Sequence, residues 1–180
     1  MRAILQAALI CVVFLAAASP AHAGGVEAQT AFDELKSLAG TWRGKPEGEG
    51  AEAEAEAKKV GEVIHEFRVS AAGTVVMETM GPGTEHEMIN MYHLDGKDLV
   101  LTHYCAGGNQ PTMKLNREKS SVAKLVFDFT GGTNLDPSKD QHIHAAEIKV
   151  VDGNHLESAW SGYAAGEQVS TMTFHLARSQ

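Results

Sequence analysis

The stretch HEMINMYHLDGKDLVLTHYC, residues 86–105, decides the fold. Two runs of alternating residues flank Asp95-Gly96, a dipeptide typical of a two-residue β-hairpin turn. With this dipeptide at the centre of the turn, Met88 pairs with His103 and His86 with Cys105. One face of the hairpin then combines apolar groups with groups that bind ligands: His86, Met88, Asn90, Tyr92, Leu99, Leu101, His103 and Cys105. A shift of one residue would break this partition. The hairpin therefore predicts a binding site on a β-scaffold.

Similar alternation recurs along most of the remaining chain. It runs through residues 60–70, 74–80, 112–116, 125–129, 141–151 and 169–178, with turns between them. Residues 32–38 instead have apolar residues at a helical spacing. No alternation of strands with helices is visible. The chain is therefore predicted to be all-β, an antiparallel barrel or sandwich of about eight to ten strands behind a short N-terminal helix.

Two segments yield more specific expectations. If residues 152–154 form a three-residue loop, Val150 pairs with Leu156 and Ala146 with Trp160, which sets apolar residues against each other. Residues 47–59 alternate Glu with Ala or Gly before ending in two lysines. We interpret them as a weak, exposed edge strand entered through a mobile loop, with a solvated run of charge.

The N-terminus has the pattern of a cleaved export signal. Arg2 precedes an apolar run over residues 3–18, and Ala21-His22-Ala23 is a small-x-small cleavage site. We expect residues 1–23 to be a signal peptide and residues 24–180 a single domain, exported to the periplasm or the extracellular space. No second hydrophobic stretch follows, so no integral membrane segment is expected.

The net charge and the number of cysteines limit the classes of partner and the disulfides that we expect. The net charge of −8 argues against nucleic acid and against an anionic membrane surface. Cys11 lies inside the expected signal, so Cys105 is the lone cysteine of the mature chain and no intramolecular disulfide can form. A small-molecule ligand is the expected partner, and the sequence leaves the oligomeric state open.

The order of elements resembles the calycins, the group of lipocalins, fatty-acid-binding proteins and nitrobindin-like barrels. Gly40-Thr41-Trp42 follows the helical turn, and Arg178 follows residues 174–177 near the C-terminus. The resemblance implies an up-and-down β-barrel in which Trp42 closes one end and Arg178 packs across its ring. Both residues would then be structural.

Residues 91–111 and 131–144 also resemble an uncharacterised secreted bacterial family with a lipocalin-like domain. That resemblance implies no activity. The chain lacks the disulfide cysteines and the second and third signature motifs of typical lipocalins, and no haem-ligand context of the nitrobindin kind is recognisable. Retinoid or bilin specificity is therefore not carried over, and haem is not implied.

Three functions remain open. The first is non-enzymatic binding of a small, largely apolar molecule inside the barrel, without a cofactor; its candidate residues are His86, Met88, Asn90, Tyr92, His103, Cys105, His142 and His144. The second is a copper or zinc site formed by His103, Cys105, His142 and His144, because two His/Cys pairs at i, i+2 spacing supply nitrogen and sulfur donors. The third is an envelope interaction module with a solid barrel. We found no motif of a catalytic nucleophile or phosphate loop, so no catalytic residue is predicted. His65, His93, His155 and His175 are expected on outward faces or in turns.

Overall fold

The computed structural model describes residues 25–179. The expected signal peptide, residues 1–23, lies outside the described residues. The strands are β1 Gly40–Glu49, β2 Val63–Ser70, β3 Val75–Met80, β4 Met88–Asp95, β5 Asp98–Tyr104, β6 Gln110–Leu115, β7 Lys124–Thr133, β8 His142–Asp152, β9 His155–Ala164 and β10 Glu167–Arg178. The helices are α1 Ala28–Ser37 and α2 Ala51–Lys59, and a 3₁₀ turn, η1, covers Ala71–Gly73. Among these described residues no helix is long and apolar enough to cross a bilayer.

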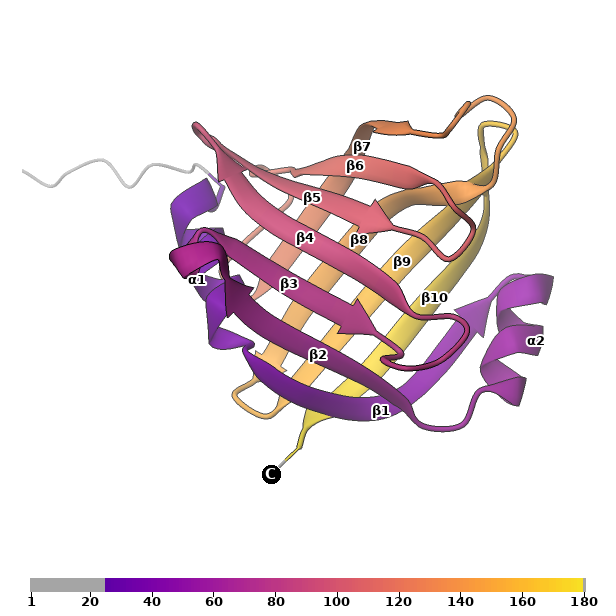
Figure 1. Ribbon diagram of the computed structural model, residues 1–180, viewed down its shortest axis with the longest axis horizontal. Helices are drawn as coiled ribbons and strands as arrows, with labels where there is room; N and C mark the ends of the chain where they lie inside the picture. Colours follow the sequence, from indigo (N-terminus) through magenta and orange to yellow (C-terminus); the bar gives the residue numbers. More distant parts are fainter. Residues whose placement is uncertain (1–24, 180) are drawn as a thin grey trace, which may run out of the picture.

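The ten strands of the described part of the chain form one closed antiparallel barrel (Figure 1). Each strand pairs with its neighbours in sequence, and β1 closes the barrel by pairing with β10. Closure leaves no strand edge without a partner. The predicted all-β, antiparallel up-and-down barrel of about eight to ten strands behind a short helix is confirmed.

Helix α1 covers one end of the barrel (Figure 1). Its apolar face, with Ala28, Ala31, Phe32 and Leu35, is buried in the core. The helix begins four residues before the predicted residues 32–38, because the helical spacing of buried side chains already starts at Ala28. One polar face stays in solvent, as expected of a helix that covers a core from one side only.

The contact implied by the calycin resemblance is present at the same end. The Arg178 guanidinium lies 4.3 Å from the centre of the Trp42 ring. Trp42 is fully buried and donates its indole N–H to the carbonyl oxygen of Leu38 at 2.8 Å. The pair thus joins the first and last strands to the end of α1.

The β4–β5 hairpin turns at Gly96-Lys97, one residue later than predicted. Gly96 has φ +58°, as the first central residue of a type II′ turn requires. Asn90 therefore pairs with His103, and the predicted pairing of Met88 with His103 is wrong. His86 and Cys105 lie outside the two strands, so they do not pair either. Since the register moves by two residues, the side-chain faces are unchanged, and Asn90, Tyr92, Leu101 and His103 all point inward as predicted.

The predicted β8–β9 register is confirmed. Val150 pairs with Leu156 and Ala146 with Trp160. The connection differs in detail: Asp152 pairs with His155 across a two-residue turn, and a bulge between Val150 and Asp152 takes up the extra residue.

The prediction of an edge strand over residues 47–59 is wrong for most of the segment. Strand β1 runs to Glu49, and residues 51–59 form helix α2. Ala, Glu and Lys are strong helix formers and poor strand formers, so intrinsic propensity prevails over the alternating pattern. Helix α2 lies beside β1, at the end of the barrel opposite α1 (Figure 1).

Candidate functional site

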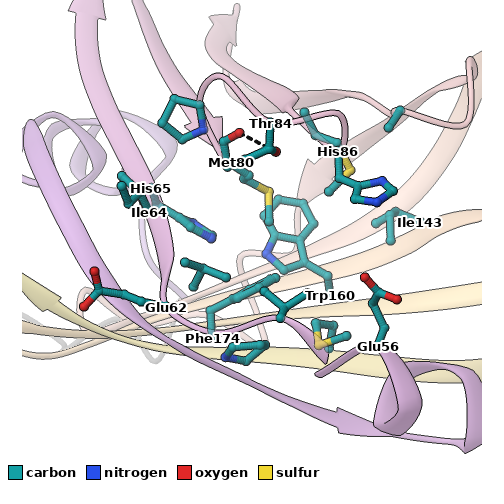
Figure 2. A pocket seen from close by; sticks show the side chains of 18 of the residues that line it. Glu56, Glu62, Ile64, His65, Met80, Thr84, His86, Ile143, Trp160 and Phe174 are labelled. Carbon is teal, nitrogen blue, oxygen red and sulfur yellow. Dashed lines mark hydrogen bonds between the residues drawn. The ribbon is translucent and has the colours of Figure 1, made fainter. Parts of the chain in front are cut away.

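A cavity of about 500 Å³ opens at the α2 end of the barrel. Its walls come from the inner faces of several strands, including Ile64 of β2, Ile143 of β8, Trp160 of β9 and Phe174 of β10, and from the β3–β4 turn. Figure 2 shows these side chains around a common space, with the indole of Trp160 between them. The volume and the largely apolar lining are typical of a small-molecule site.

Three methionines, Met80, Met88 and Met172, contribute to the cavity wall. Their unbranched thioethers adapt to irregular shapes at small energetic cost. The wall can therefore fit apolar ligands of differing outline.

A polar network lies behind this wall, and Glu78 is its centre. The fully buried Glu78 carboxyl group accepts hydrogen bonds from Asn90 Nδ2 at 2.9 Å and Tyr92 Oη at 2.7 Å on one oxygen. Its other oxygen lies 2.8 Å from His65 Nδ1. A carboxylate oxygen only accepts, so beside an ionised Glu78 the His65 Nδ1 atom carries the proton and donates. Burial, and then the Glu78 charge, raise the pKa of Tyr92 well above its usual value, so this hydroxyl stays a donor.

His103 extends the network to the cavity. Its Nδ1 lies 2.7 Å from Asn90 Oδ1, and since the amide nitrogen of Asn90 faces Glu78, Nδ1 carries the proton. In the neutral ring Nε2 then holds a lone pair. Burial lowers the pKa of His103 to about 4, although the Glu78 charge opposes this shift. His103 is therefore neutral at pH 7, and within the described residues its buried Nε2 has no hydrogen-bond partner.

The cavity lining among the described residues includes no lysine and no arginine. Two acidic side chains, Glu56 and Glu62, lie at the mouth, and both are about half exposed. Glu62 pairs with Arg43 at 3.1 Å, outside the cavity lining.

The predicted ligand-binding residues fall into three groups. His86, Met88 and His103 line the cavity, although His86 is mostly exposed at its mouth. Asn90 and Tyr92 are fully buried and act behind the wall through Glu78. The remaining three do not belong to the lining: Cys105, His142 and His144.

His142 and His144 form a separate aromatic cluster at the start of β8. Their facing nitrogens, His142 Nε2 and His144 Nδ1, are 3.0 Å apart, because a bulge between Ile143 and Ala145 alters the i, i+2 geometry. The His144 ring stacks on Phe129 and on Tyr163, with centroid distances of 4.6 and 4.0 Å.

The alternative metal set is not assembled in the part of the chain that the structure describes. Residues 25–179 contain no group of three or more His, Cys, Asp or Glu side chains that could hold a metal ion. Cys105 is a free, half-buried thiol in the loop after β5, where it accepts a hydrogen bond from the Gly107 amide. His103, Cys105, His142 and His144 therefore do not converge on one point.

Sequence reasoning missed two members of the network, His65 and Glu78. His65 was expected on an outward face, but it is 1% exposed and lines the cavity. The signal was present, since His65 alternates in step with Phe67, and Glu78 with Val76 and Met80. A polar residue on an apolar face of a strand indicates a buried partner.

Comparison with known proteins gives information about the fold of this chain only. No family model matches the chain, and no curated protein matches it. Similar solved structures include a protein of unknown function from the DUF3598 family of Nostoc punctiforme, with 12% identity and a TM-score of 0.52 over 81% of this chain. Another is Rv2717c from M. tuberculosis, with 15% identity and a TM-score of 0.50, covering 83% of this chain and 98% of that one. The present chain spans about half the length of the DUF3598 protein, 49%. These likenesses show the barrel and nothing of its ligand.

Proposed function

We propose that this protein binds a small, largely apolar molecule in the cavity at the α2 end of its barrel. The observation that carries the proposal is the 500 Å³ largely apolar cavity, which has His103 in its lining; among the described residues the buried Nε2 of this ring has no hydrogen-bond partner. A solid barrel would have no such cavity. The proposed binding needs no cofactor and no catalytic residue.

The setting proposed for this function is outside the cytoplasm. The export signal expected in residues 1–23 and the calycin resemblance both fit an extracytoplasmic carrier or sensor of apolar molecules. The arrangement of Trp42 and Arg178 supports a calycin-like barrel.

The test uses a neutral fluorescent probe, N-phenyl-1-naphthylamine, whose emission rises in apolar surroundings. We expect saturable binding at one site per chain. The substitution Met172→Trp adds bulk to the cavity wall and should weaken binding at least tenfold.

The matched control is Met77→Trp. Met77 lies on β3 but not in the cavity lining, and its sulfur accepts a hydrogen bond from Arg68 on the outer surface. This variant should bind the probe as the parent does. Equal binding by the parent and Met172→Trp would place the probe elsewhere and overturn the proposal.

A further inference from the structure

The buried Nε2 atom of His103, which has no hydrogen-bond partner among the described residues, indicates what kind of ligand the cavity accepts. A buried acceptor without a hydrogen bond is destabilising, because it has lost its hydration and gained no partner. Asn90 holds Nδ1 and so fixes the tautomer in which Nε2 can only accept. A ligand that donates a hydrogen bond at this point would satisfy the Nε2 acceptor.

The charges around the cavity act against an anionic ligand. His103 is neutral at pH 7, and no lysine or arginine belongs to the described lining. His65 also lines the cavity, but any charge on its ring is compensated by the Glu78 carboxylate at 2.8 Å. A carboxylate head would therefore lose its water without gaining a lysine or arginine partner in the described lining.

We propose that the cavity is selective for uncharged apolar molecules that carry one hydroxyl or N–H donor, with His103 Nε2 as the acceptor, and that it discriminates against carboxylates. This inference rests on the proposed function, because it names the ligand class of the same cavity.

The ligand must reach an atom that is now covered. Nε2 is buried, and the Trp160 ring lies 5.4 Å from the His103 ring, centroid to centroid. Flexible members of the same lining, Met88 and Met172, can change rotamer to make room. The hydrogen bond therefore forms together with a small rearrangement of the cavity wall.

The experiment compares three probes with chains of similar length by isothermal titration calorimetry at pH 7: 1-decanol, its isomer 1-methoxynonane, and decanoate. The ether keeps the oxygen and the size of the alcohol but has no donor. We expect the alcohol to bind roughly five- to thirtyfold more tightly than the ether, the effect of one hydrogen bond to a buried acceptor. Decanoate should bind at least tenfold more weakly than the alcohol.

The variant His103→Phe should reduce the alcohol's affinity to that of the ether while leaving the ether itself within about twofold. His155→Phe makes the same change at an exposed site outside the cavity, and should keep the preference. If His103→Phe does not fold, the affinities of the parent protein for the three probes are sufficient to test the ligand class.

The outcomes separate the two proposals. Equal binding of alcohol and ether, or tighter binding of decanoate, would overturn the ligand class and leave the apolar cavity standing. If none of the three probes bound, and the fluorescent probe also failed to bind, the proposed function itself would fall.

Discussion

The Arg178 side chain joins the Trp42 ring to the C-terminus of α1. Its guanidinium carbon lies 4.3 Å from the ring centre, while its two terminal nitrogens donate to the carbonyl oxygens of Ser37 and Ala39 at 3.0 and 2.8 Å. Ser37 is the last residue of α1 and Ala39 lies just beyond it, where backbone acceptors lack intrahelical donors. The Arg178 side chain therefore attaches helix α1 to the barrel.

Arg178→Lys tests this role. The ammonium keeps the charge but cannot reach two carbonyls while it stacks on the indole, so we expect a loss of about 1–3 kcal/mol in unfolding free energy. Urea denaturation monitored by tryptophan fluorescence measures it. Arg68→Lys is the control, since Arg68 donates only to Met77 among the described residues, and its effect should stay within about 0.5 kcal/mol. Equal effects would contradict the role given to Arg178.

The Glu78 network predicts a large effect of a nearly isosteric change. In Glu78→Gln an amide replaces the carboxylate, so at least one of the donors from His65, Asn90 and Tyr92 faces an N–H group. We expect a loss of about 2–4 kcal/mol in unfolding free energy, because a buried donor is left unsatisfied. The control Glu66→Gln changes an exposed carboxylate of β2 and should be nearly neutral. Equal denaturation midpoints for the two variants would exclude a central role for Glu78.

His103 makes stability depend on pH. Its pKa is lowered to about 4 in the folded protein, against 6.5 for an ordinary histidine. Above pH 6.5 the ring is neutral in both states. As the pH falls from 6.5 to 4 the unfolded chain takes up the proton first, and the folded state loses up to about 3 kcal/mol.

The measurement is the difference in unfolding free energy between the parent and His103→Gln at pH 7.5, 6.0 and 5.0. We expect the parent to lose stability more steeply than the variant over this range. His144, whose pKa is also lowered, chiefly by burial, is common to both proteins and cancels in the difference. Parallel curves would mean that His103 keeps its ordinary pKa.

Gly48 sets the distance between β1 and α2. A Cβ atom there would lie 2.2 Å from backbone atoms of Ala53, so Gly48→Ala must push the helix away from the strand. We expect faster cleavage of native protein by a glutamate-specific protease at Glu52, Glu54 and Glu56. Gly61→Ala adds the same methyl group where no atom lies within 4 Å, and should be cleaved at the parent's rate. Similar cleavage rates in both variants would show that α2 is not held by this contact.

The hairpin at residues 88–104 shows which structural features an alternating sequence pattern predicts and which it does not. It predicted which side chains face inward, because the side-chain period of a strand is two residues and a register change of two leaves it intact. It did not predict that His103 pairs with Asn90, since the turn lies at Gly96-Lys97 and not at Asp95-Gly96. That pairing, and the hydrogen bond it allows, depends on which turn fits the twist of the whole barrel.

In residues 47–59 the alternating pattern predicted the wrong secondary structure. Alternation predicted a strand, whereas residues 51–59 consist only of Ala, Glu and Lys, which favour a helix. Past Glu49 the chain leaves β1, so no neighbouring strand supplies the hydrogen bonds that could override this preference.

The sequence alone determined the all-β class, the N-terminal helix and the inward faces of the strands, since these follow from local periodicity and turn residues. Periodicity left a barrel and a sandwich open, and the calycin resemblance favoured the barrel. Only the tertiary structure decided the site. His65, Glu78, Asn90 and His103 come from four successive strands and meet through the registers between them. It also separated Cys105, His142 and His144 from the cavity, because the loop after β5 and the bulge in β8 place them elsewhere. Registers depend on contacts between residues far apart in the chain, and no local pattern encodes them.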